Sequence, residues 1–240
     1  MGAIDVGFED PVKAAKGADL IVLCTPVLML SPLLKQIAPA LNPGALVTDV
    51  GSTKGSIVRD AATLMPATAA FVGSHPMAGS EKRGVQYAKA DLFDGAMCIV
   101  TPTASTSATA LGKVDDFWRL LGMHVTHMDA EVHDRAVSDI SHLPHLLAAA
   151  LMAMQSEASL AVAGRGFADM TRIAAGDGGL WRDILLDNRE RVRESLSDFK
   201  AQIAKIESLL DADDLEGVKQ WLDQAAARRE QMKAKKEPTL

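Results

Sequence analysis

The sequence predicts an α/β fold, with a doubly wound parallel sheet in the first half of the chain and helices in the second. Two observations lead to this class. Up to about residue 128, short apolar runs alternate with helical stretches, which is the β-α-β order of a doubly wound sheet. From residue 129 onward the pattern is almost entirely helical. The predicted domains are therefore 1–128 and 129–240.

Composition narrows the class of function. Of the 240 residues, 48% are hydrophobic and 23% charged, as in ordinary globular proteins. The net charge of −6 is a poor match for nucleic acid or an anionic membrane, so a small-molecule or protein partner is expected. The longest nearly apolar run, Leu143–Met154, is too short to span a membrane, and no secretory signal is visible. A cytoplasmic protein without a metal site is expected.

Five strands are expected in the first half, and each is read from a short apolar run. The first of these runs is apolar throughout, which is typical of a strand buried on both faces of a parallel sheet. Helices are expected at 27–41 and 56–65, between the first three strands. Ligands of such a sheet bind at the carboxyl ends of its strands. The predicted strands are 18–24, 45–50, 69–72, 96–100 and 123–126.

The second half contains one helical stretch that is apolar nearly all round, Leu146–Ala163. A lone surface helix could not tolerate this pattern, so other helices or a second subunit are expected to enclose it. A dimer follows as an expectation. Further on, apolar residues at spacings of three and four from Val192 to Leu209 predict a long amphipathic helix, then a turn at 211–214 and a last helix containing Trp221.

His75 is the first candidate for chemistry. It lies in the segment Gly73-Ser-His-Pro-Met-Ala-Gly79, directly after the predicted strand 69–72. A histidine held between glycines and a proline at the carboxyl end of a strand can reach a ligand with little entropy left to lose. By position alone, a structural and a functional role are equally supported.

A second candidate is the segment Ser141-His-Leu-Pro-His145. Pro144 removes a helical hydrogen bond and is expected to kink the helix. Ser141 and His145 are four residues apart and share a helix face. A core histidine pair bonded to the backbone explains this pattern as well as a ligand site does. The other histidines, including His133, lack such context and are interpreted as structural or exposed.

Arg172 and Trp181 form the third candidate. Arg172 follows a short segment bounded by glycine, where a guanidinium can be held as a two-pronged donor for a carboxylate. By itself this pattern favours a salt bridge within a helix or between domains over a ligand site.

Taken together, these segments resemble the prephenate and arogenate (cyclohexadienyl) dehydrogenases, NAD- or NADP-dependent enzymes of tyrosine biosynthesis. The resemblance includes His75-Pro-Met-Ala-Gly-Ser-Glu81 and extends from about Ala18 to Asn188. It implies a Rossmann-type domain followed by an all-helical domain that forms a homodimer. The matching segments, in the order of the family, are 18–26, 48–54, 75–81, 90–93, 141–145, 166–172 and 181–188.

The resemblance also implies roles for single residues. The histidine at the position of His75 meets the ring hydroxyl of the substrate as hydrogen-bond acceptor or base. Arg172 would bind a substrate carboxylate, and Ser52 would lie beside both the nicotinamide and the ring hydroxyl. Thr25 and Pro26 would border the nicotinamide with Ser52. The residues implied to line or shape the substrate pocket are Glu81, Ser141, His142, His145 and Trp181.

One part of the family pattern has no match in these 240 residues, the strand and Gly-x-Gly-x-x-Gly turn that hold the pyrophosphate. The implied fold is therefore an N-terminally truncated Rossmann-type sheet, short by roughly 40 to 60 residues. Two explanations stay open. The sequence is a fragment, or begins at a wrong Met, and belongs to an ordinary dehydrogenase. Alternatively, it is a non-catalytic dimeric remnant that binds prephenate-like ligands. Retention of His75, Arg172 and Trp181 favours the first.

A dehydrogenase of β-hydroxy acids with a helical dimer domain is the competing enzyme class. Such enzymes usually employ a lysine base. The histidine segments around His75 and at 141–145 argue against this class.

Overall fold

The computed structural model describes residues 4–79 and 85–234. The chain forms two compact units, Met1–Val192 and Arg193–Leu240. The first contains an α/β region followed by helices, as predicted. The domain boundary predicted at residue 128 coincides with the change from α/β to helical elements and not with the border between the two compact units. It stays a prediction.

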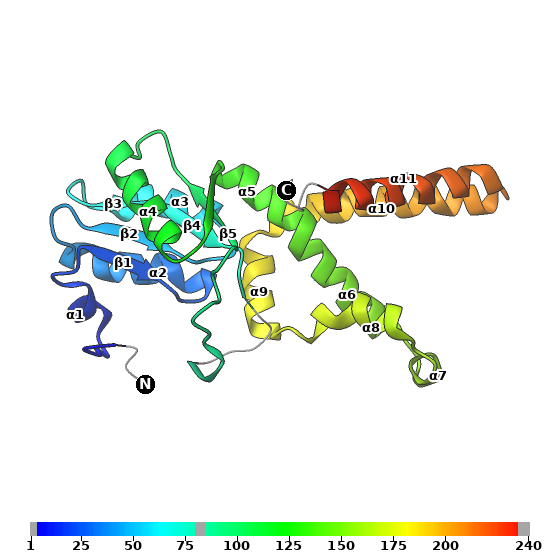
Figure 1. The fold of residues 1–240 in the computed structure, drawn as a ribbon, viewed down its shortest axis with the longest axis horizontal. Helices are drawn as coiled ribbons and strands as arrows, with labels where there is room; N and C mark the ends of the chain where they lie inside the picture. The colour runs from blue at the N-terminus through cyan, green and yellow to red at the C-terminus, as the bar shows by residue number, and fades with distance from the viewer. Residues whose placement is uncertain (1–3, 80–84, 235–240) are drawn as a thin grey trace. The chain divides into compact units, whose positions relative to one another are not determined.

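The strands of the α/β region form two three-stranded sheets that share a nearly continuous strand (Figure 1). In the first sheet β1, β2 and β3 are parallel. In the second, β5 pairs antiparallel with β4 and parallel with β6. Their bounds are β1 Leu20–Leu23, β2 Leu46–Asp49, β3 Ala70–Phe71, β4 Gly73–Pro76, β5 Met97–Thr101 and β6 His124–His127.

The two sheets are bonded together where β3 continues into β4. The N–H of Val72, between them, donates to the carbonyl of Val47 in β2 (2.9 Å). Two residues later, the buried hydroxyl of Ser74 donates to the carbonyl of Asp49 (2.6 Å) and accepts from the indole N–H of Trp118 (3.0 Å). β4 therefore stays fixed to the end of β2 although its main-chain ladder runs to β5.

The sheet differs from the expected parallel sheet in two ways. Gly73–Pro76, which was placed directly after the predicted strand 69–72 and not among the strands, is a strand antiparallel to β5; its Gly-Ser-His-Pro composition is typical of a turn, but pairing with β5 overrides that local preference. β1 is not buried on both faces, because Leu20 is 37% exposed. Among the described residues only β2 pairs with it.

Helices cover both faces of the sheet and create two cores. On one face, α2, α3 and the later helix α9 pack around β1 and Val47 of β2. On the other, α4 packs with Trp118 against Leu46 and β5. Adjacent side chains of β2 thus enter opposite cores, as expected for a buried strand. The elements of this region are α1 Pro11–Ala15, α2 Val27–Ile37, η1 Ala38–Ala40, α3 Gly55–Leu64, η2 Val85–Tyr87 and α4 Ala108–Leu120.

The second half is helical, as predicted. The kink expected at Pro144 is a π-helical turn, η3 Ser138–His142, which lies directly before α6. In this turn the N–H of Leu143 donates to the carbonyl of Ser138. The predicted long helix and the last helix are present, joined by a turn at residues 212–214. The helices are α5 Ala130–Val137, α6 Leu143–Ala153, α7 Glu157–Ala161, α8 Arg165–Thr171, η4 Arg172–Ala175, α9 Gly178–Asp187, α10 Arg189–Asp211 and α11 Leu215–Ala234.

The apolar stretch Leu146–Ala163 divides into the end of α6, a turn and α7. Much of it is exposed in the single chain, with Met154 at 74% and Val162 at 83%. The helical run Ala130–Ala153 is long and apolar enough to cross a membrane by length and composition alone. Interior helices of soluble proteins also pass that test. His133 and His142 within this run are fully buried, whereas only 28% of its apolar window is buried in the single chain.

Candidate active site

His75 is the first member of a line of hydrogen bonds that runs from the sheet into the helical half. Its Nδ1 lies 2.9 Å from Nε2 of His133, on α5. Nδ1 of His133 lies in turn 2.8 Å from Oδ1 of Asp134. His133 is completely buried, whereas His75 is only partly buried. The open end of the line is therefore His75.

Asp134 is anchored to the N-terminus of α3. Its two carboxylate oxygens accept from the backbone N–H groups of Lys54 (2.7 Å) and Gly55 (2.8 Å), which otherwise lack a side-chain cap. Burial opposes ionisation of this carboxyl, but the hydrogen bonds from His133 and the two backbone groups outweigh it and lower its pKa. The same loop, between β2 and α3, carries Ser52.

Asn188 joins this line to His142. Its side-chain N–H₂ group donates to the carbonyl of Asp134 (2.7 Å) and lies 3.2 Å from Nδ1 of His142. Since an amide nitrogen can only donate, Nδ1 of His142 is the acceptor. His75 and His142, separated by 67 positions in the sequence, thus belong to one network.

Trp181, on α9, brings His142 and His145 together. The His145 ring stacks on the indole at a centroid distance of 3.6 Å and an angle of 12°, while the His142 ring approaches edge-on at 6.2 Å. Gly176 lies close against this stack, because a Cβ there would be 2.5 Å from Nε1 of Trp181. The three side chains form one aromatic wall.

Burial favours the neutral form of His75, His142 and His145. It lowers the pKa of His75 well below 6.5, and His133, Lys54 and His142 add to that shift. Burial also lowers the pKa of His142 to about 4, despite the opposing charge of Asp134, and lowers that of His145. Neutral imidazoles can accept a proton from a ligand at pH 7.

A buried ion pair supports the loop that carries Ser52. The ammonium of Lys54 donates to Asp49, and both side chains are fully buried. Asp49 also accepts from the N–H groups of Gly51 (2.8 Å) and Ser74 (3.1 Å). The carboxylate thus connects the loop to β4, the strand of His75.

The other predicted substrate residues lie at the edge of this network or outside the described residues. Arg172 is exposed at the start of η4, which packs on α6, and no carboxylate in the described parts of the chain pairs with it. Ser141 is half-buried in the π turn beside His142. Glu81 lies outside the described residues.

The predicted cofactor residues lie at the ends of β1 and β2, as expected. Pro26 is the N-cap residue of α2, and Ser52 is half-buried after β2. Within residues 4–79 and 85–234, three buried side-chain polar atoms have no hydrogen-bond partner: Oγ1 of Thr25, Oγ1 of Thr101 and Nδ1 of His145. Thr25 and His145 are both predicted ligand contacts. An unpartnered hydroxyl at Thr25 fits the polar amide of a nicotinamide.

Sequence reasoning missed His133, Asp134 and Asn188. His133 is buried, in agreement with its interpretation as a structural residue. Its contact with His75 was not expected. No local signal marks it, because its partner is 58 residues away. The adjacent pair His133-Asp134 on a predicted helix, with Asn188 ending the last segment of family resemblance, was the only available hint.

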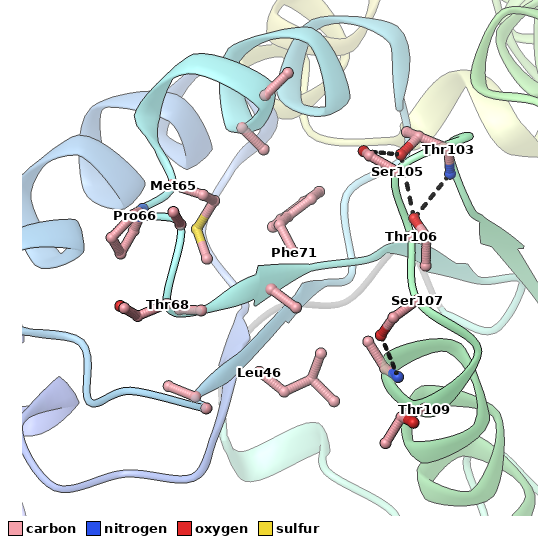
Figure 2. A pocket seen from close by; sticks show the side chains of 18 of the residues that line it. Leu46, Met65, Pro66, Thr68, Phe71, Thr103, Ser105, Thr106, Ser107 and Thr109 are labelled. Atoms are coloured by element: carbon pink, nitrogen blue, oxygen red, sulfur yellow. Dashed lines mark hydrogen bonds between the residues drawn. The ribbon is translucent and has the colours of Figure 1, made fainter.

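Two cavities lie in the part of the chain that the structure describes. One of about 450 Å³ includes Asp134 and Asn188 in its wall and therefore adjoins the network. Another, of about 620 Å³, lies between α3 and the start of α4 and contains none of the predicted site residues (Figure 2). Its hydroxyls at Thr103, Ser105 and Thr106 bond to one another, whereas Oγ1 of Thr101, a residue that also lines it, has no partner.

Family comparisons cover nearly the whole chain. Residues 1–127 match the model described as "Prephenate dehydrogenase, nucleotide-binding domain". Residues 129–224 match the one described as "Prephenate dehydrogenase, dimerization domain".

Individual relatives agree with the family models. The chain is 33% identical to the prephenate dehydrogenase of Bacillus subtilis, over 96% of this chain and 64% of the Bacillus protein. It is also 33% identical to the cyclohexadienyl dehydrogenase of Zymomonas mobilis, over 86% of this chain and 72% of that one. The solved prephenate dehydrogenase of Aquifex aeolicus in complex with hydroxyphenyl propionate and NAD+ superimposes with a TM-score of 0.88 at 33% identity, over 95% of this chain and 82% of that one. The chain thus spans about two thirds of the Bacillus protein.

Proposed function

Because the chain belongs to the prephenate dehydrogenase family, we propose that it oxidatively decarboxylates prephenate or arogenate with NAD or NADP, a reaction of tyrosine biosynthesis. The observation that carries the proposal is the network connecting His75 to the aromatic wall of His142, His145 and Trp181. It places neutral imidazoles and a flat apolar surface together, which suits a ring that carries a hydroxyl and carboxylates.

His75 is proposed as the base. The reaction removes a hydride from C4 of the substrate ring, and uptake of the hydroxyl proton by His75 helps to expel it. Such a base is typically worth about 10²- to 10⁴-fold in rate. A base must be unprotonated at the working pH, and the lowered pKa of His75 meets this condition. Ser52 is proposed to lie beside the same hydroxyl.

Substrate binding is proposed to rest on Arg172 and the aromatic wall. The ring carboxylate leaves as carbon dioxide, so it must be held as an anion without receiving a proton. A guanidinium keeps its charge and can do this. Trp181, with His142 and His145, would pack against the ring, and Nδ1 of His145 has a free position for a polar group. Ser141 and Glu81 complete the proposed pocket.

Thr25, Pro26 and Ser52 are proposed to hold the nicotinamide end of the cofactor. When bound, NAD or NADP supplies the acceptor for the hydride. The unpartnered Thr25 hydroxyl would bond to the cofactor's amide, and Pro26 would limit the space beside the ring.

We further propose a homodimer in the cytoplasm. The match of residues 129–224 to a dimerization domain and the exposed apolar side chains of Met152, Met154 and Val162, at the end of α6 and on either side of α7, support a second copy as the partner. Both cysteines are free thiols, which agrees with a reducing compartment.

The test measures turnover and binding separately. Absorbance at 340 nm is followed with prephenate or arogenate and either NAD or NADP, with His75→Asn as the inactive control. Quenching of Trp181 fluorescence by prephenate, with Trp181→Phe as control, reports substrate binding without cofactor. We expect reduced cofactor from the native chain and a loss of at least about 10²-fold in His75→Asn.

Two results would contradict the proposal. Absence of both fluorescence change and turnover would remove the substrate assignment. Binding of prephenate without any reduced cofactor would contradict catalysis and support a non-catalytic ligand-binding protein.

A further inference from the structure

We propose that His133 and Asp134 are positioning residues that hold His75 in a single tautomer, with its proton on Nδ1 and the lone pair of Nε2 directed to the substrate. This inference rests on the proposed function for its catalytic meaning. Its structural part concerns the hydrogen-bonded line from Asp134 through His133 to His75.

The direction of each bond follows from Asp134. An ionised carboxylate only accepts hydrogen bonds, so Nδ1 of His133 must carry the proton in the 2.8 Å contact. We place His133 in its neutral form, in which Nε2 carries no proton. The 2.9 Å contact with His75 requires one proton between two nitrogens. Nδ1 of His75 therefore donates, and its Nε2 is left as the free acceptor.

The anchoring of Asp134 makes this order rigid. Both its oxygens accept from backbone N–H groups at the start of α3, and His133 is completely buried. Neither residue can rotate without breaking several buried bonds. The line therefore sets both the ring orientation and the proton position of His75.

The line also balances charge during the reaction. When the substrate hydroxyl gives its proton to Nε2, His75 becomes a cation with N–H groups on both sides. Its Nδ1–H still points at His133, and the negative charge of Asp134 lies behind that ring. The other groups that face His75 do not supply this balance, because Lys54 carries a positive charge already paired with Asp49, and His142 is neutral.

The first experiment requires no turnover. Two-bond proton–nitrogen NMR of the ¹⁵N-labelled native chain at pH 7 identifies which ring nitrogen of His75 is protonated, and His75→Asn assigns the signals. We expect Nδ1–H and a bare Nε2. Protonation of Nε2 instead would overturn the proposal, whether or not the chain oxidises prephenate, so this result is independent of the proposed function.

The second experiment measures kinetics. His133→Leu removes the acceptor for His75 and should lower kcat about 10²-fold, with the KM for prephenate changed less than about threefold. His133→Gln restores an acceptor at the Nε2 position and should recover part of that loss. His127→Leu is the matched control, since His127 is likewise paired with an aspartate, Asp115 (3.0 Å), but not with His75; it should keep native kinetics.

A pH profile separates positioning from simple loss of fold. Asp134→Asn removes the negative charge behind His133, so protonation of His75 becomes harder and the acid limb of kcat/KM should move to lower pH. Circular dichroism confirms that each variant is folded. An unshifted acid limb in folded Asp134→Asn, or equal kcat in His133→Leu and the native chain, would overturn the proposal.

Discussion

Arg172 is exposed and, in the described parts of the chain, has no carboxylate partner. The salt bridge that its sequence context favoured is not present there. A charge-assisted bond to a substrate carboxylate contributes roughly 1.5–3 kcal/mol. Arg172→Ala should therefore weaken prephenate binding about ten- to a hundred-fold, measured by Trp181 fluorescence. Arg165→Ala, an exposed arginine at the start of α8, is the control, and equal affinity of both variants would contradict the assignment.

His142 makes stability depend on pH. Its pKa is about 4 in the folded chain against 6.5 for an ordinary histidine, so the unfolded state binds the proton more tightly. The stabilisation is complete above pH 6.5 and is lost as the pH falls toward 4, by roughly 3 kcal/mol.

Urea unfolding at pH 7 and pH 4.5 tests this dependence. His142→Asn should lose less stability between the two pH values than the native chain does. His124→Asn, at an exposed position of β6, should behave like the native chain. An equal loss of stability between the two pH values in all three proteins would show that His142 is not its cause.

At the scale of elements, the connection between η4 and α9 positions the aromatic wall. Gly176 allows Trp181 to approach, since a Cβ there would lie 2.5 Å from its Nε1 and 3.0 Å from His145. Gly176→Ala must therefore move the indole away from His145. We expect a shifted Trp181 emission spectrum and a KM for prephenate raised about tenfold. Gly178→Ala, where nothing lies within 4 Å, should leave both unchanged; a native KM in Gly176→Ala would show that the stack is not needed.

Most elements were predictable, and the exceptions have physical causes. Apolar runs and turn residues locate five strands, and Pro144 locates the irregular turn before α6. β4 was missed because Gly-Ser-His-Pro has no strand preference of its own and becomes a strand only by pairing with Met97–Thr101. The candidate site shows the same limit. His75 and Trp181 were identified from local motifs and family resemblance, but the contact of His75 with His133 depends on how α5 packs.

At the scale of the whole molecule, the exposed apolar side chains of the helical half predict self-association. Met154 is 74% exposed in the turn after α6, so Met154→Asp should raise the dimer dissociation constant at least about tenfold without affecting the fold of the single chain. Sedimentation velocity over a concentration series measures this. Leu120→Asp is the control, because Leu120 is 85% exposed but lies in the α/β half. A monomeric native chain would contradict the prediction.

The shared strand from Ala70 to Pro76 has a consequence for how the α/β region opens. Its first part is held by β2 and its second by β5, and the Ser74 hydroxyl is bonded to both Asp49 and Trp118. The two sheets cannot separate from each other unless the hydrogen bonds of this strand are broken. The amide protons of β2, β4 and β5 should therefore exchange with deuterium in one cooperative step, at the free energy of global unfolding. β1, with a single strand partner among the described residues, should exchange earlier.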